Sequence, residues 1–297
     1  MAVSRIAPAG PAGRLRIILE MIKFEHTVFA LPFALISTVL ASKTLPGGLP
    51  SGATVSWIIA AMVGARSAAM AFNRIVDREF DAANPRTASR AIPAGLLTVG
   101  QVWAFTLASI ALFVLAAAML NPLCLALSPL ALLAILGYSY TKRVTSLAHC
   151  ALGFGIGIAP IGAWIAVTGR LDATPLLLGA AVMLWIGGFD IIYALQDVDF
   201  DTRAGLHSLP RRLGKGRALA VSRWMHAAMI GLLAMAGLGA GLGGAYFAGV
   251  ALAGGLIAYE HSIVSPDDLS RVNTAFFTLN GWISVLLFGF VLLDRVL

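Results

Sequence analysis

The chain alternates between long apolar runs and short segments that carry charge, proline or glycine. Nine runs are found, at residues 22–41, 54–73, 100–119, 122–140, 148–167, 174–196, 217–240, 242–260 and 273–294. Each is close to the roughly 20 residues that a helix needs to cross a bilayer. The runs lack the period-two alternation of a membrane β-barrel, and a helix pairs its backbone groups internally. The predicted fold class is therefore all-α, a single transmembrane domain over residues 1–297 with a short basic N-terminal segment at about residues 1–21.

Composition and charge agree with a membrane protein. Hydrophobic residues make up 59% of the chain and charged residues 12%, with a mean hydropathy of +0.87, whereas soluble domains carry about 25% charged residues. Outside the runs, 16 Lys and Arg lie in the N-terminal segment and the even-numbered loops, and 3 lie on the other side. This asymmetry predicts a cytoplasmic N-terminus and an external C-terminus. It also explains the net charge of +7 without a nucleic-acid partner, and none is expected.

Two predicted helices, 120 residues apart, repeat one spacing of polar residues at the same membrane surface. Offsets of seven and four residues place such side chains near one helix face. Carboxylates one turn apart repel each other, and a divalent cation with oxygen ligands, such as Mg²⁺ bridging to a diphosphate, removes that penalty. The shared spacing also suggests an internal duplication. The first set is Arg66, Asn73, Asp77 and Asp81, and the second is Asp190, Asp197 and Asp201.

The remaining polar residues are interpreted by their position. Arg66 and Asp190 lie about two turns inside apolar runs, where ionisable groups are costly, so we expect a polar cavity beneath the loops. A structural ion pair between these two residues is the alternative. Arg74 and Arg78 are expected to be solvated loop charges. His149, like most of the histidines, shows no metal-ligand spacing and is interpreted as an ordinary interface residue.

Basic residues accompany the acidic ones on the loops, and they are suited to binding the remaining charge of a diphosphate. These are Arg86, Arg90, Lys142 and Arg143. His26, at the cytoplasmic end of the first run, is a weaker candidate for contact with a polar acceptor.

Three segments resemble motifs of the UbiA superfamily of intramembrane prenyltransferases, and the likeness extends from about residue 15 to the C-terminus. Asn73-x3-Asp77-x3-Asp81, followed by AANPRTASRAIPAG, is similar to the first aspartate-rich motif of that family. Asp190-x2-Tyr193-Ala194-x-Gln196-Asp197-x3-Asp201 is similar to the second, and GYSYTKRVTSLAH is similar to the Tyr…Lys-Arg segment. One position departs from the family, because Arg74 stands where many members carry an aspartate after the asparagine.

The resemblance implies a nine-helix bundle around a central cavity, in the bacterial inner membrane, with the active-site loops facing the cytoplasm and lipid around the helices. It implies Mg²⁺-dependent transfer of a prenyl group from a polyprenyl diphosphate to an aromatic acid acceptor in ubiquinone or menaquinone biosynthesis. The residues implied as metal ligands are Asn73, Asp77, Asp81, Asp197 and Asp201. Those implied to contact substrate or diphosphate are Arg66, Asn73, Arg90, Lys142, Arg143 and Tyr193. The residues implied in catalysis are Asp77, Asp197 and Asp190, the last by steering the acceptor hydroxyl or taking its proton.

The acceptor stays open between two aromatic acids. The sequence variant looks like the branch that prenylates 4-hydroxybenzoate, or its relative that acts on 1,4-dihydroxy-6-naphthoate in the futalosine route to menaquinone. From another class, a secondary transporter would use Arg66 and Asp190 as a coupling pair. Transporters bind near the bilayer midplane, whereas the carboxylates here cluster at one surface, and this favours the enzyme.

Overall fold

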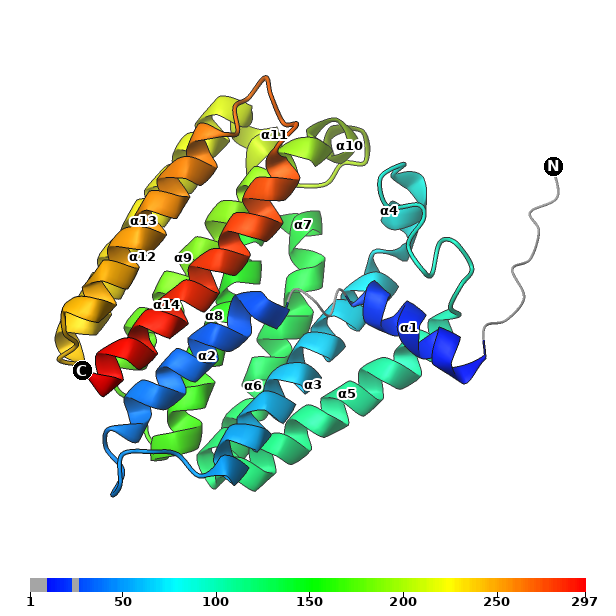
Figure 1. Cartoon of the computed structure of the whole chain (residues 1–297). Helices are drawn as coiled ribbons and strands as arrows, with labels where there is room; N and C mark the ends of the chain where they lie inside the picture. Colours follow the sequence, from blue (N-terminus) through cyan, green and yellow to red (C-terminus); the bar gives the residue numbers. More distant parts are fainter. Residues whose placement is uncertain (1–9, 23–26) are drawn as a thin grey trace.

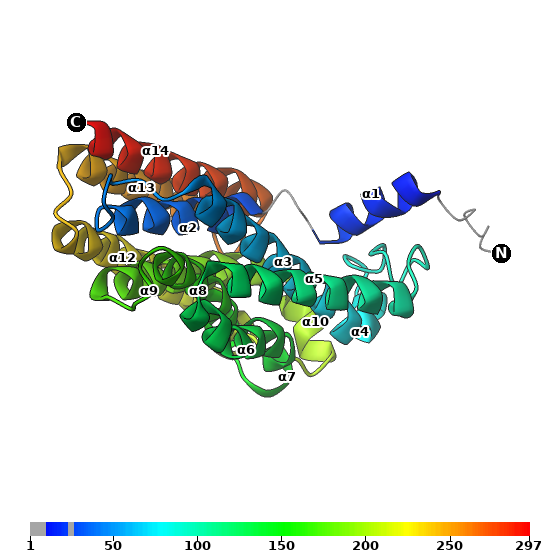
Figure 2. The same ribbon diagram turned by 90° about the horizontal axis from the view of Figure 1, so that it is seen from below.

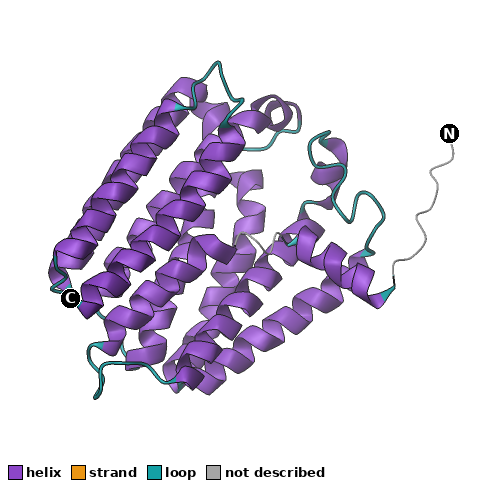
Figure 3. Ribbon diagram, viewed as in Figure 1, coloured by secondary structure: helices purple, strands orange, loops and turns teal. Residues whose placement is uncertain are grey.

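The molecule is a bundle of long helices joined by short loops (Figure 1). The computed structural model describes residues 10–22 and 27–297, and no strand occurs in these ranges (Figure 3). His26 and the start of the first predicted span therefore lie outside the described residues. The long helices are α2 (Thr27–Ser42), α3 (Gly52–Val76), α5 (Val99–Leu120), α6 (Pro122–Gly137), α8 (Ala148–Thr168), α9 (Ala173–Ala194), α12 (Lys215–Gly239), α13 (Gly244–Ser262) and α14 (Asn280–Val296). The all-α prediction is confirmed.

Seven helical segments of the described chain are long and apolar enough to cross a membrane. They are Gly52–Val76, Val99–Leu120, Pro122–Val144, Ala148–Thr168, Ala173–Arg203, Lys215–Gly239 and Thr274–Val296. The other two predicted spans correspond to α2, which contributes a shorter apolar helix at Phe29–Ser42, and to α13. The count of nine membrane spans stays a prediction, although each predicted span coincides with a helix.

Helix α9 is the most deeply buried element of the bundle. It packs against α8 and α12, and α2 packs against α8 and also contacts α9, where the rings of Phe33 and Trp185 lie 5.1 Å apart (Figure 2). Leu178, Val182, Trp185 and Ile186 of α9 have no exposed surface. Such complete burial is expected for a central helix, and it fixes the position of the polar residues at the end of α9.

Glycines allow α8 and α9 to approach each other closely. A Cβ atom on Gly153 would lie 2.2 Å from the carbonyl oxygen of Met183, and one on Gly157 would lie 2.5 Å from that of Gly179. Small residues at helix interfaces permit this kind of backbone contact in membrane bundles. Backbone contacts therefore fix the distance between the two helices.

Polar side chains close the tight connection between α5 and α6. Asn121 caps α6 by accepting a hydrogen bond from the backbone amide of Cys124 (2.9 Å), and Pro122 follows at the first helical position. The Asn121 amide also donates to the carbonyl of Ile165 (2.8 Å) on α8. A capped turn of this kind satisfies backbone groups that the bilayer would leave unpaired.

The structure also contains helices that the apolar pattern did not predict. Residues Pro11–Met21 form α1, within the segment expected only to be short and basic. Short helices follow the long ones on the loops: α4 (Arg78–Ala83), α7 (Thr141–Val144), α10 (Val198–Arg203) and α11 (Leu209–Leu213). The last predicted span is divided, because Thr274–Leu279 form a π-helix, η4, before α14 begins.

Candidate active site

The loops at one end of the bundle enclose a cavity of about 750 Å³. Its wall includes all the candidate site residues from the two acidic motifs and the basic loops, whereas His26 lies outside the described residues. The candidate residues in the wall are Arg66, Asn73, Asp77, Asp81, Arg86, Arg90, Lys142, Arg143, Asp190, Tyr193, Asp197 and Asp201. Because these residues come from three separate regions of the chain, 66–90, 142–143 and 190–201, their convergence is a property of the fold. The expected polar cavity beneath the loops is present.

Each acidic motif contains a break at the first of two aspartates that lie four residues apart, although in the second motif α9 already ends at Ala194 and a 3₁₀ helix, Leu195–Asp197, follows. Asp77 ends α3 with φ −90° and ψ 5° and begins the six-residue helix α4. Asp197 has φ −99° and ψ 2° and begins the six-residue helix α10. Asp81 and Asp201 then lie in the first turn of these short helices. The repeated geometry supports the internal duplication that the spacing suggested.

Cations surround the carboxylate of Asp81 in the first motif. Arg90 Nη1 lies 2.6 Å from Asp81 Oδ1, and Arg74 Nη1 lies 3.8 Å from Oδ2. Asn73 Nδ2 donates to Asp77 Oδ2 at 2.8 Å. The expectation that Arg74 is a solvated loop charge is wrong, because this residue is only 9% exposed. It lies three residues before Asp77, where α3 breaks, and the helix turns it inward onto Asp81.

Arg86 holds the carboxylate of the second motif. Its Nε and Nη2 atoms donate to the two oxygens of Asp197 at 2.9 and 2.6 Å, a bidentate pair between segments 111 residues apart. Arg86 also donates to the Tyr193 hydroxyl at 3.1 Å, and its guanidinium carbon lies 5.3 Å from the centre of that ring. Bidentate arginine pairs fix geometry as well as charge. Arg86 therefore ties the first acidic loop to the second.

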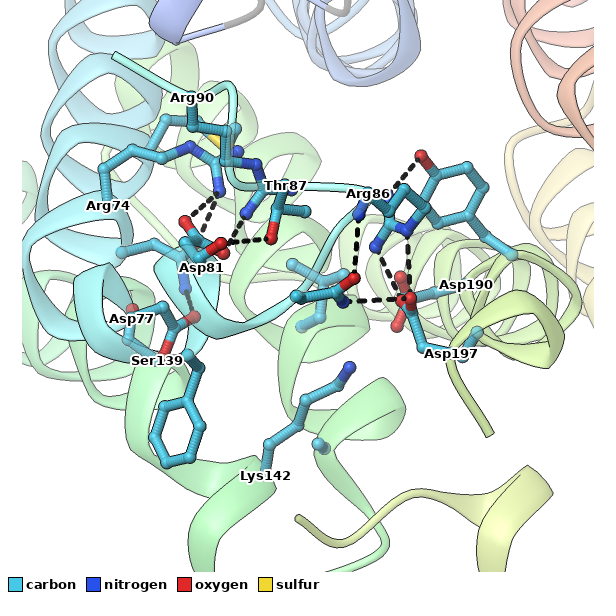
Figure 4. Close-up of a pocket in the computed structure, with 18 of the residues that line it drawn as sticks. Arg74, Asp77, Asp81, Arg86, Thr87, Arg90, Ser139, Lys142, Asp190 and Asp197 are labelled. Carbon is cyan, nitrogen blue, oxygen red and sulfur yellow. Dashed lines mark hydrogen bonds and ion pairs between the residues drawn. The ribbon is translucent and has the colours of Figure 1, made fainter. Parts of the chain in front are cut away.

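The third side of the cavity carries Lys142 and Arg143. Figure 4 shows the Arg74, Arg90 and Asp81 group on one side and Arg86 on the other, with the Lys142 side chain pointing into the space between them. Arg143 donates to the carbonyl of Val76 at 2.7 Å and lies 3.4 Å from Asp77 Oδ1. Two cationic side chains therefore face two acidic motifs, which is a charge pattern suited to a ligand that bears both a cation and an anion.

Deeper in the cavity, Asp190 pairs with a histidine that the sequence did not identify as a site residue. His149 Nδ1 lies 2.6 Å from Asp190 Oδ2, so the interpretation of His149 as an ordinary interface residue is wrong. The sequence feature that could have identified His149 was its position in an apolar run, because ionisable groups there tend to face a partner or a cavity. Asp190 was identified because it lies about two turns inside its apolar run, whereas His149 is the second residue of the run 148–167.

An aromatic wall completes the cavity on the side of α9 and η4. The Tyr193 and Phe276 rings lie 4.3 Å apart, and Phe276 also packs against Phe189 at 5.0 Å. Asn280 supports the π-helix that carries Phe276 by donating to the carbonyl of Ala275 at 2.9 Å. Tyr193 was expected from the family resemblance, whereas Phe189 and Phe276 were not predicted, because an aromatic residue inside an apolar run looks like any other packing residue.

The loop charges perturb each other. Burial, and then the negative charge of Asp81, raise the pKa of Asp77, against the opposing effect of Asn73 and Arg143. Burial lowers the pKa of Arg86, but its hydrogen bonds and charge interaction with Asp197 outweigh that effect and raise it. Both motifs therefore already hold arginines, at Asp81 and at Asp197. The raised pKa of Asp77 shows that its charge is unfavourable there, and a further cation would offset that cost.

The residues present fit a hard divalent cation shared with a diphosphate. In the described ranges no three His, Cys, Asp or Glu converge on one point. Mg²⁺ does not need such a cage, because it commonly binds through one or two carboxylates plus substrate phosphates. Asp81 Oδ2 and Asp201 Oδ2 are buried and accept no hydrogen bond; Arg74 Nη1 is 3.8 Å from the first of them, beyond hydrogen-bond range. A buried carboxylate oxygen without a hydrogen bond is costly. Each motif therefore offers one oxygen suited to a metal.

A second, apolar cavity of about 390 Å³ lies between α3, α5, α6 and α8. It shares five lining residues with the polar cavity, so the two adjoin. These are Arg66, Met70, Tyr138, Leu152 and Ile156. The pair of cavities offers a charged compartment next to a hydrocarbon compartment, as an amphipathic ligand requires.

The chain matches a family model and is similar in sequence to known proteins. A model of the UbiA prenyltransferase family matches residues 30–282. The 4-hydroxybenzoate octaprenyltransferase of Aromatoleum aromaticum is 31% identical over 294 residues, 98% of each chain. That of Xanthomonas campestris pv. campestris is 35% identical over 245 residues, 82% of this chain and 80% of the relative.

Solved structures of UbiA homologs are similar to this chain in fold. The apo structure of a UbiA homolog from Aeropyrum pernix K1 has a TM-score of 0.82 at 35% identity, covering 91% of this chain and 98% of that one. A UbiA homolog from Archaeoglobus fulgidus bound to GPP and Mg²⁺ shares the fold, with a TM-score of 0.70 at 18% identity over 95% of this chain and 100% of that one.

Proposed function

The chain belongs to the UbiA prenyltransferase family, and on that premise we propose that it transfers a polyprenyl group from a polyprenyl diphosphate to 4-hydroxybenzoate in a Mg²⁺-dependent reaction of ubiquinone or menaquinone biosynthesis. The observation that carries the proposal is the pair of broken acidic helices that meet, with six basic residues, across one polar cavity beside an apolar one. The names of the curated relatives support the choice of acceptor.

The donor would lie across the two cavities. Asn73, Asp77, Asp81, Asp197 and Asp201 would hold Mg²⁺, and the metal supplies positive charge that stabilises the leaving diphosphate. Arg90, Lys142 and Arg143 would bind the remaining phosphate oxygens. The prenyl tail would occupy the apolar cavity of about 390 Å³, where it is removed from water.

The acceptor would lie in the deep part of the polar cavity. Arg66 would bind its carboxylate, and Asp190 would receive the proton of its phenolic hydroxyl. The aromatic wall of Tyr193 and Phe276 would face the allylic cation, because ring faces attract positive charge. The dry apolar compartment would protect that cation from capture by water.

The bond changes balance without another reactant. The C1–O bond of the donor breaks, and the diphosphate leaves with the electron pair. A ring carbon ortho to the hydroxyl forms the new bond to C1 while the phenolic proton passes to Asp190, which yields a neutral dienone. The hydrogen on that ring carbon then leaves as a proton to the diphosphate, and Asp190 returns its proton to the oxygen.

The test is an acceptor assay with purified protein in detergent, Mg²⁺ and a polyprenyl diphosphate. 4-Hydroxybenzoate and 1,4-dihydroxy-6-naphthoate are supplied separately, and lipophilic products are identified by mass. Magnesium-dependent product with 4-hydroxybenzoate supports the proposal. Product with the naphthoate alone would assign the enzyme to the futalosine route instead. Absence of donor binding by the folded protein would favour the transporter.

The orientation of the site is part of the same proposal. With 16 of the 21 Lys and Arg on the N-terminal side, we infer that the cavity opens at the cytoplasmic face of the inner membrane. A topology reporter fused after Leu297 should report the external side. A cytoplasmic signal would contradict the predicted topology of nine spans.

A further inference from the structure

A buried histidine and a carboxylate form an isolated pair in the wall of the polar cavity. The side chain of His149 on α8 has no exposed surface, whereas that of Asp190 on α9 is 22% exposed. Their nearest atoms, Nδ1 and Oδ2, are 2.6 Å apart. The histidine is therefore hidden behind the aspartate, and only the aspartate faces the cavity.

The fold leaves this pair little freedom. Gly187 lies one turn before Asp190, and a Cβ atom there would approach the backbone oxygen of His149 to 3.2 Å. Gly153, one turn after His149, is in backbone contact with Met183 of α9. The two side chains thus project from helices whose separation is fixed on both sides of the pair. Their hydrogen bond is set by packing and not by loop conformation.

The hydrogen bond to Asp190 leaves the other ring nitrogen of His149 without a partner. His149 Nε2 is buried and has no hydrogen-bond partner. An ionised carboxylate only accepts hydrogen bonds, so Nδ1 carries the proton of this bond and donates to Asp190 Oδ2.

We propose that His149 is a positioning residue for prenyl transfer, which holds Asp190 Oδ2 so that Oδ1 faces the phenolic hydroxyl of the aromatic acceptor. This role rests on the proposed function and adds a residue to it. A carboxylate held through one oxygen keeps a fixed direction for the other, as in the histidine–carboxylate pairs of other enzymes. The proton moves only between the acceptor oxygen and Asp190, as described above, while His149 keeps its own proton.

Two substitutions of similar size separate this role from a purely structural one. His149→Asn places an amide nitrogen where Nδ1 lies and preserves the hydrogen bond to Asp190. His149→Gln places the amide one carbon further along, where Nε2 lies, and loses that bond. His226 is a matched control, since it is also fully buried but pairs with the Trp185 carbonyl and with His261. Its Asn and Gln variants correct for the cost of altering a buried histidine.

The measurements are kcat and the KM values of donor and acceptor for each folded variant. We expect His149→Gln to lower kcat by about 10- to 100-fold, the usual effect of removing a supporting hydrogen bond. The donor KM should be unchanged, because the diphosphate lies at the other motifs, and His149→Asn should recover most of the loss. Neither His226 variant should produce this pattern.

The proposal is overturned if the Asn and Gln variants of His149 have equal kcat, or if the donor KM changes together with the acceptor KM. A fluorinated 4-hydroxybenzoate, whose phenol is more acidic, provides an independent measurement, because it should reduce the defect of His149→Gln relative to the wild type. An undiminished defect would also count against the role. Failure of the wild type to prenylate any aromatic acid would refute the proposed function instead, and this outcome is visible before any variant is compared.

Discussion

Gly153 is the position where a single added methyl group should separate the two helices that carry His149 and Asp190. A Cβ atom there would lie 2.2 Å from the Met183 oxygen, whereas ordinary contact begins at 3.4 Å. In Gly153→Ala, α8 and α9 must therefore move apart locally by about 1 Å, because both contacting groups are backbone atoms. Overpacking of this kind costs about 1–3 kcal/mol.

The same displacement of α8 from α9 should also lower the rate of prenyl transfer. A hydrogen bond of 2.6 Å between His149 and Asp190 that lengthens by about 1 Å passes beyond the usual donor–acceptor range. Misplacement of a reacting group by about 1 Å can reduce the rate by about 100-fold. We therefore expect Gly153→Ala to lower both kcat and the free energy of unfolding, with a smaller effect on donor binding.

The assay pairs denaturant unfolding in detergent with steady-state kinetics, and Gly155→Ala is the control. Gly155 is on the same helix, but its Cβ atom would meet Ile135 at 3.7 Å, which is ordinary contact. Alanine there should be neutral or stabilising by up to about 1 kcal/mol, because it is a better helix former than glycine. If Gly153→Ala and Gly155→Ala unfold at the same denaturant concentration and turn over equally, the argument from backbone contact is refuted.

Three further outcomes are expected. Arg86→Lys should lower the rate of prenyl transfer from the donor, because lysine cannot make the bidentate contact to both oxygens of Asp197. Kinetics equal to the wild type would show that the contact is dispensable. Asp201→Asn should raise the Mg²⁺ concentration needed for half-maximal transfer, and an unchanged magnesium titration would remove this residue from the metal ligands. Asn280→Leu should lower the free energy of unfolding by about 1–3 kcal/mol, because the buried Glu260 carboxyl group loses the hydrogen-bond donor that lies 3.0 Å away. Glu260→Gln, with Asn280 intact, should lower the free energy of unfolding by less. Equal unfolding midpoints for the two variants would contradict this.

Apolar run length was sufficient to predict most of the long helices. The predicted run 148–167 became Ala148–Thr168, and 100–119 became Val99–Leu120. Length was a reliable guide because a bilayer accepts only segments that pair their own backbone. The short helix Arg78–Ala83 and the amphipathic Pro11–Met21 were not predicted, because neither contains an apolar run. Neither helix has a side-chain cap at its N-terminal end. Helix α1 packs against the bundle through Ile17, Ile18 and Met21, so its formation depends on contacts in the folded chain.

The candidate site was predictable where spacing along one helix carries the information. Asp77 and Asp81, and likewise Asp197 and Asp201, follow from an offset of four residues. The pairing of His149 with Asp190 depends on how α8 docks against α9 across 41 residues, and no local pattern encodes that contact. The inward turn of Arg74 similarly depends on where α3 breaks.

The arginine–aspartate pairs described above determine how the site can be filled. Arg86 covers both oxygens of Asp197 and Arg90 covers one oxygen of Asp81, so a metal or a phosphate that binds to these groups must displace a partner already present. Asp81 Oδ2 and Asp201 Oδ2, by contrast, accept no hydrogen bond. A cation alone would compete with the arginines for the carboxylates, and a diphosphate alone would compete with the carboxylates for the arginines. A magnesium–diphosphate complex satisfies both sets in one exchange of partners. Mg²⁺ and the donor should therefore bind to the site together, and each should strongly increase the affinity of the protein for the other.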